Sequence, residues 1–174
     1  DQKAIIILEK EGEIKHPDSN YNFGIKIRKE IVVKKNIIEF SIKGNILKKP
    51  QSDDNLGEFL KELNLGVDIP FFFNGDPKNF SWKSHQLEED IIQDNLLQDP
   101  FQYFGTHFSA YDKTYDLTLD LEIDSNLNNK IIKFPLISYT WTDEGYKDIF
   151  QGINVIPIFN FGKDFIINIK ITIL

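Results

Sequence analysis

The chain has 174 residues, 41% of them hydrophobic and 27% charged, which is ordinary for a globular protein of one domain. Its formal net charge of −7 argues against binding to nucleic acid or to an anionic membrane, because both attract basic surfaces. No apolar run approaches the roughly 18 residues that a membrane helix needs, so we expect no integral membrane segment.

Two residue types are missing from the composition. The absence of Cys excludes disulfides and thiolate metal sites. The absence of Met and the start at Asp1 indicate that a leader was removed or that the sequence was cut from a longer one. We therefore favour an exported protein, whether periplasmic, secreted or surface-anchored, over a cytoplasmic one.

The first part of the chain has the pattern of β-strands. Residues 4–8 (AIIIL) form a continuous apolar run, which is typical of a strand buried on both faces. Apolar and polar residues then alternate over 23–27 and again over 38–42, and the second of these runs continues to Leu47. We predict three strands in this part.

The middle of the chain changes period. From Leu56 to Leu63, apolar residues recur at i, i+3, i+4 and i+7, the stripe of an amphipathic helix that Gly66 would end. A second helix is predicted from about Ser84, ending before Pro100. We thus expect a one- or two-helix insertion at about residues 53–98.

Strand patterns return after the insertion. Residues 115–123 alternate strictly, residues 131–141 form another strand, and runs at 153–159 and 165–173 form a terminal hairpin. Strands that flank a helical insertion predict a mainly β protein, an antiparallel β-sandwich or open barrel. Without an interior linker, residues 1–174 are expected to form one domain.

Acidic residues share one face of the predicted strand at 115–123. They suit either a Ca²⁺ ion or a cationic partner, or they belong to a solvated face that pairs with lysines on the next strand. Residues two apart on a strand lie about 7 Å apart, too far to share one ion without help from loops. We therefore predict no metal, and the residues that remain candidates are Asp116, Asp120 and Asp124.

Catalytic motifs are missing from the sequence. There is no Cys nucleophile, no Gly-x-Ser-x-Gly elbow and no glycine-rich phosphate loop, so we expect no cofactor and lean against an enzyme. His85 and Glu89 would share one face of the second helix, where they form either a surface ion pair or an acid–base pair of a hydrolase.

Aromatic residues beside turns supply the best binding candidates. Trp82 follows a turn, and Trp141 lies close to Asp143 and Tyr146. Such rings with neighbouring carboxylates could stack on a sugar or anchor a protein partner, whereas the alternation of Ile137, Tyr139 and Trp141 also fits a core face.

The sequence therefore leads to three functional hypotheses. The first is a non-catalytic interaction or structural domain, part of an exported or cell-surface assembly, with a protein as its main partner. The second is a carbohydrate-binding module that uses loop aromatics to hold a glycan. The third is a hydrolase with a carboxylate and histidine site.

Overall fold

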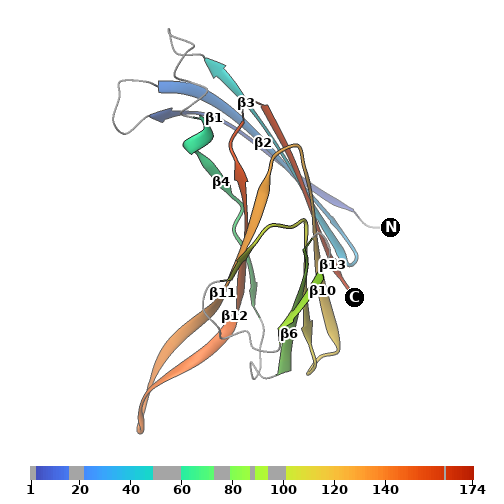
Figure 1. The fold of residues 1–174 in the computed structure, drawn as a ribbon, viewed down its shortest axis with the longest axis vertical. Helices are drawn as coiled ribbons and strands as arrows, with labels where there is room; N and C mark the ends of the chain where they lie inside the picture. The colour runs from blue at the N-terminus through green and yellow to red at the C-terminus, as the bar shows by residue number, and fades with distance from the viewer. Residues whose placement is uncertain are drawn as a thin grey trace. The chain divides into compact units, whose positions relative to one another are not determined.

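The computed structural model describes residues 3–15, 22–48, 60–72, 79–86, 89–93, 101–162 and 164–174, and most of these residues lie in β-strands (Figure 1). The strands are β1 (Ala4–Lys15), β2 (Asn22–Lys34), β3 (Ile37–Lys48), β4 (Asn64–Gly66), β5 (Ile69–Phe72), β6 (Phe80–Gln86), β7 (Glu89–Gln93), β8 (Phe101–Tyr103), β9 (His107–Asp112), β10 (Leu117–Ser125), β11 (Asn129–Thr142), β12 (Gly145–Asn160) and β13 (Asp164–Ile173). The strand pairs are antiparallel, and the prediction of a mainly β, sandwich-like fold is confirmed.

The chain forms two compact units. The first contains residues 1–65, 121–128 and 159–172, and the second contains residues 66–120, 129–158 and 173–174. The strands β4, β10, β12 and β13 contribute residues to both units.

The first unit is a sheet in the order β1-β2-β3-β13-β10. The alternation in β13 decides its two faces: Phe165, Ile167, Ile169 and Ile171 are buried, and the residues between them are exposed or half-buried. The rings of Phe23, Phe161 and Phe165 pack against one another in this core, with centroid distances of 6.5 Å and 5.3 Å.

The prediction that residues 4–8 form a strand buried on both faces is wrong. They do form the first part of β1, but Ile5, Ile6, Ile7 and Leu8 are 50–55% exposed. A strand is buried on both faces only when other elements pack over both faces of its sheet, and the exposure of these residues shows that no described element covers either face of this segment.

The second unit has two sets of strands, β7-β6-β9 with the start of β10, and β8-β11-β12 with β5 paired to β12. Its core is aromatic and aliphatic. Phe80 packs on Phe150 at a centroid distance of 5.5 Å, and Trp82 stacks on Phe108 at 5.9 Å. These contacts join β6 to β12 and to β9.

The prediction of a second helix from Ser84 is wrong. Residues 80–86 are β6, which pairs with β9 on one side and with β7 on the other. Phe80, Trp82 and Ser84 are buried and the residues between them are not, so the period is two. Cross-strand pairing on both sides of β6 overrides the weak helical pattern of this polar segment.

Of the first predicted helix, the structure shows one turn, residues 60–62. Residues 49–59 lie outside the described part of the chain. Gly66 does not end this helix, because it belongs to β4. In the described ranges, no helix is long and apolar enough to cross a membrane.

A lysine lies in the core of the second unit. Lys133 on β11 is fully buried, and its Nζ lies 4.9 Å from the centroid of the Trp82 ring. None of the described residues forms a hydrogen bond with this Nζ. Burial lowers the pKa of Lys133 to about 8, because the charged ammonium loses its hydration.

Replacing Gly44 is expected to destabilise the protein. Gly44 is opposite Phe165, and a Cβ at Gly44 would overlap the buried Phe165 ring. We expect Gly44→Ala to lower the free energy of unfolding by about 1–3 kcal/mol in urea titrations. Gly12→Ala on β1 is the matched control, since nothing lies within 4 Å of a Cβ there. Equal stabilities of the two variants would contradict this packing.

Replacing Lys133 is expected to stabilise the protein. A pKa that falls from 10.5 to about 8 on folding costs about 3 kcal/mol wherever both states are protonated. The cation–π contact offsets part of that cost, so we expect Lys133→Met to raise the free energy of unfolding by roughly 1–3 kcal/mol at pH 7.

The pH dependence has a definite sign. Between about pH 8 and 10.5 the folded protein has lost the Lys133 proton and the unfolded chain still holds it, so wild-type stability rises with pH. This rise should vanish in Lys133→Met and persist in Lys130→Met, a change on the same strand at a half-buried position. A wild-type curve parallel to that of Lys133→Met would contradict the burial of a protonated lysine.

Candidate functional site

The structure separates the two tryptophans that the sequence singled out. Trp82 lies on β6 and is 1% exposed, between the ring of Phe108 and the ammonium of Lys133. Trp141 lies near the end of β11 and is 70% exposed. Only Trp141 therefore has a ring face that a ligand can reach.

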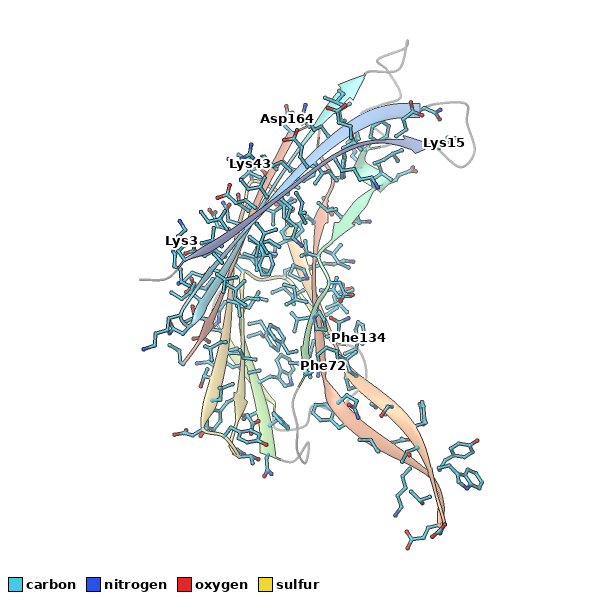
Figure 2. All side chains as sticks on the ribbon, turned by 180° about the vertical axis from the view of Figure 1, so that it is seen from behind. Lys3, Lys15, Lys43, Phe72, Phe134 and Asp164 are labelled. Atoms are coloured by element: carbon cyan, nitrogen blue, oxygen red, sulfur yellow. The ribbon has the colours of Figure 1, made fainter. Side chains whose placement is uncertain are left out.

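The setting of Trp141 is a long hairpin formed by β11 and β12 (Figure 1). All residues from Phe134 to Ile149 are described, and none of them is buried. Figure 2 labels Phe134 at the point where this exposed part begins. We call residues 134–149 the hairpin arm.

The turn of the arm is fixed by local hydrogen bonds. Asp143 and Glu144 connect the strands, the Thr142 Oγ1 donates to the Gly145 carbonyl at 2.9 Å, and the Glu144 N–H donates to the same Oγ1 at 3.3 Å. Gly145 has a φ of 108°, a left-handed value that favours glycine. A salt bridge of 2.6 Å between Glu144 and Lys147 also spans the turn.

Three aromatic side chains on the arm are almost fully accessible. Tyr139, Trp141 and Tyr146 are 73%, 70% and 75% exposed, and we call them the aromatic strip. Tyr139 and Trp141 share a face because they are two apart on β11. Tyr146 joins them from β12, with its ring edge-on to Trp141 at a centroid distance of 4.6 Å and an interplanar angle of 84°.

Polar groups lie beside the strip. Asp143 is exposed in the turn, and Asp148 is exposed two residues after Tyr146, hence on the same face of β12. Carboxylates accept hydrogen bonds from hydroxyl groups. The arm therefore offers exposed rings and acceptors that are not enclosed by other elements.

The acidic residues at 116–124 do not gather at one point. Asp116 lies in the turn before β10, with a φ of 51°, and its Oδ1 accepts a hydrogen bond from the Tyr111 hydroxyl at 2.9 Å. Asp120 lies 3.7 Å from the Nε2 of His107. In the described residues, no three His, Cys, Asp or Glu side chains are grouped so as to hold a metal.

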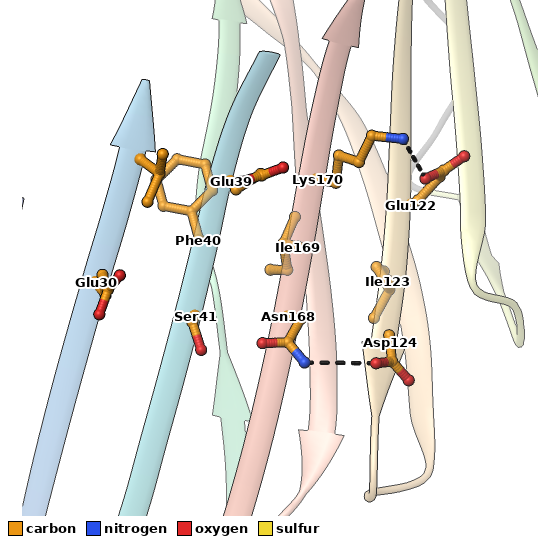
Figure 3. A pocket seen from close by; sticks show the side chains of 11 residues that line it. Glu30, Glu39, Phe40, Ser41, Glu122, Ile123, Asp124, Asn168, Ile169 and Lys170 are labelled. Atoms are coloured by element: carbon orange, nitrogen blue, oxygen red, sulfur yellow. Dashed lines mark hydrogen bonds and ion pairs between the residues drawn. The ribbon is translucent and has the colours of Figure 1, made fainter. Parts of the chain in front are cut away.

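Glu122 and Asp124 lie in a depression of about 440 Å³ on the first unit. Figure 3 shows the Lys170 ammonium donating to Glu122 at 2.9 Å and the Asn168 amide donating to Asp124 at 3.4 Å. Each carboxylate thus has a cross-strand donor on β13, which is what a solvated sheet face requires.

His85 and Glu89 do not lie on one helix. His85 is on β6 opposite Asp90 on β7, and Glu89 is opposite Gln86. The predicted spacing of four residues on a helix face is therefore wrong, because the chain turns back between the two residues. Their side chains lie outside the described part, so an acid–base pair has no geometric support here.

The sequence contains two signals for the strip, and the first of them also fits a core face. Ile137, Tyr139 and Trp141 alternate with Ser138, Thr140 and Thr142, as in a strand with one buried face. The second signal is the pair of rings on either side of a two-residue turn, Trp141 and Tyr146. Periodicity shows that the rings share a face but not that this face stays uncovered.

The chain matches a family model along residues 1–173. The model describes the C-terminal part of α-amylase and 4-α-glucanotransferase. The chain belongs to this family of C-terminal domains. No curated protein matches its sequence.

A solved structure supports the same fold. The chain is similar to part of the crystal structure of 4-α-glucanotransferase from Thermococcus litoralis, with a TM-score of 0.63 and 14% sequence identity. The match covers 95% of this chain and 20% of that chain. The chain therefore spans about one-fifth of the length of that enzyme, and the likeness concerns the fold alone.

The contrast between the tryptophans is directly measurable. We expect Trp82→Phe to leave a red-shifted emission that acrylamide quenches, because only the exposed Trp141 remains. Trp141→Phe should leave a blue-shifted emission that acrylamide hardly quenches. Steady-state fluorescence of the two variants checks both, and similar quenching in the two would contradict the placement of these indoles.

Proposed function

We propose that this chain is a non-catalytic accessory domain of an α-glucan-acting enzyme, and that its aromatic strip binds the glucan. The observation that carries the proposal is the exposure of Tyr139, Trp141 and Tyr146, between 70% and 75% each, on one hairpin arm. The membership in a family of C-terminal domains of amylases and glucanotransferases supports the choice of glucan.

Exposing the rings of the aromatic strip to water costs free energy when no ligand covers them. Large rings stabilise a fold by burial, and a cluster of them on the surface indicates a binding site. Trp and Tyr combine a rigid apolar face with a polar atom, so they can stack on the C–H face of a sugar and still donate a hydrogen bond. Asp143 and Asp148 supply acceptors for sugar hydroxyl groups on the same arm.

The angle within the strip favours a curved ligand. Trp141 and Tyr146 meet at 84°, so their open faces are not coplanar. A flat, extended chain such as a β-1,4-glucan needs coplanar rings to stack along its length. An α-1,4-glucan coils, so successive sugar units can meet faces that are turned relative to one another.

Removing the central ring tests the proposal. We expect Trp141→Ala to weaken binding to maltoheptaose and amylose about tenfold, because one lost aromatic stack is worth roughly 1.4 kcal/mol. Isothermal titration calorimetry and affinity electrophoresis measure the change. Tyr146→Ala should have a smaller effect in the same direction, since it removes a second ring and the edge contact.

The control is Tyr115→Ala, which removes a ring of 60% exposure in the second unit but outside the arm. It should bind as the wild type does. Equal binding by Trp141→Ala and wild type would contradict the role of the strip. Failure of the wild type to bind any glucan would contradict the proposed function itself.

A further inference from the structure

The turn of the hairpin arm fixes which residues of β11 and β12 lie opposite each other. β11 ends at Thr142, β12 begins at Gly145, and two residues connect them. Because the two strands are hydrogen-bonded neighbours in a hairpin, Thr142 lies opposite Gly145, and the other pairs follow by counting outward from the turn. This count places Tyr139 opposite Asp148.

Two contacts agree with this register. The count places Trp141 opposite Tyr146, and the centroids of their rings are 4.6 Å apart. It places Ser138 and Gln151 together on the other face of the arm, and the Gln151 amide donates a hydrogen bond to the Ser138 hydroxyl at 3.0 Å. The face that carries the aromatic strip therefore has a ring opposite a ring next to the turn, and a ring opposite a carboxylate one pair further in.

The exposure of the side chains divides this face into a buried end and an open end. Phe150 is 8% exposed and packs on Phe80, whereas Ile137, opposite Phe150 in this register, is 37% exposed. In the next pair toward the turn, both Tyr139 and Asp148 are exposed. The core thus ends just before this pair, which is the first pair on the face with both side chains open to a ligand.

The Asp148 carboxylate is available to a ligand. In the part of the chain that the structure describes, no other residue forms a hydrogen bond or an ion pair with this side chain. The neighbouring Lys147 is on the other face of the strand and pairs with Glu144. Residues that lie opposite each other on two strands have Cβ atoms about 5 Å apart, so the carboxylate lies beside the Tyr139 ring.

We propose that Asp148 orients the glucan by accepting hydrogen bonds from the 2- and 3-hydroxyl groups of the glucose unit that stacks on Tyr139. This inference rests on the proposed binding of glucan to the aromatic strip. A glucose unit that stacks on an aromatic ring presents C–H groups to the ring face and directs its equatorial hydroxyl groups outward from its edge. A carboxylate beside the aromatic ring therefore meets hydroxyl groups.

The chemistry of the carboxylate selects this pair of hydroxyl groups. Its two oxygen atoms only accept hydrogen bonds, and together they bind two donors that lie side by side. In a 1,4-linked glucan the oxygen atoms at carbons 1 and 4 form the linkages, so the free hydroxyl groups on adjacent carbons are those at carbons 2 and 3. The hydroxyl at carbon 6 stands alone and would engage one carboxylate oxygen only.

Asp143 is the matched control for Asp148. Both aspartates are exposed on the arm, and replacing either one removes a single negative charge. Asp143 lies in the turn, however, beyond the last strand pair, so no strand partner places it beside a ring of the aromatic strip. The two substitutions therefore differ in position and agree in their effect on the charge of the arm.

Replacing Asp148 tests its role. We expect Asp148→Ala to weaken the binding of maltoheptaose about tenfold in isothermal titration calorimetry, because charge-assisted hydrogen bonds are lost and the rings remain. Asp148→Asn should lose less, about threefold, since its amide oxygen still accepts a hydrogen bond. Asp143→Ala should bind within about twofold of the wild type, because solvent screens an exposed charge that makes no contact. Circular dichroism checks that the variants fold alike.

Methylated ligands identify the hydroxyl groups. β-Cyclodextrin is a ring of α-1,4-linked glucose units that can be methylated either at oxygens 2 and 3 or at oxygen 6. Methylation at oxygens 2 and 3 should abolish the difference in affinity between wild type and Asp148→Ala, because an ether oxygen has no proton to donate. Methylation at oxygen 6 should leave that difference unchanged.

The outcomes separate this inference from the proposed function. Equal affinities of wild type and Asp148→Ala for maltoheptaose would overturn the role of Asp148 and leave glucan binding by the rings intact. Equal losses in Asp148→Ala and Asp143→Ala would show an effect of the arm's charge alone, and a difference abolished by methylation at oxygen 6 would assign another hydroxyl group; either result overturns the inference. A wild type that binds neither maltoheptaose nor β-cyclodextrin would overturn the proposed function as well.

Discussion

The first unit depends on the place of β13 in the middle of its sheet. This strand pairs with β3 over nine residues and with β10 on its other side, although β3 and β13 are far apart in the sequence. Its inward-facing Phe165, Ile167 and Ile169 are at most 1% exposed. Two features favour the observed register of β13 on β3. The Phe165 ring fits closely over Gly44, and a shift by one residue would turn the aliphatic face of β13 outward.

The second unit is built differently, around aromatic rings and a buried cation. Trp82 is held between Phe108 and Lys133, so its indole supports the core. The lysine costs free energy in that position, and the π-face of Trp82 recovers part of it. In the core, this tryptophan connects β6 to β9 and β11 through its contacts with Phe108 and Lys133.

The hairpin arm and β1 each carry several exposed apolar side chains. On the arm these groups are aromatic and lie beside carboxylates, a combination suited to sugars. On β1 they are aliphatic and belong to the end strand of the sheet. The two exposed surfaces thus differ in the chemistry of their side chains.

The sequence by itself determined the strands with strict alternation and the antiparallel β class. Of the runs predicted at 115–123 and 165–173, residues 117–123 appear in β10 and residues 165–173 in β13, because period two follows from backbone geometry alone, whereas residues 115 and 116 belong to the turn before β10. The segment from Ser84 could not be assigned this way, since its neighbours β7 and β9 impose the strand. The tertiary structure also decided which faces are covered. Trp82 and Trp141 both lie on alternating strands, yet one is 1% exposed and the other 70%, because the Trp82 ring contacts Phe108 and Lys133 in the core whereas Trp141 lies on the hairpin arm, none of whose residues is buried.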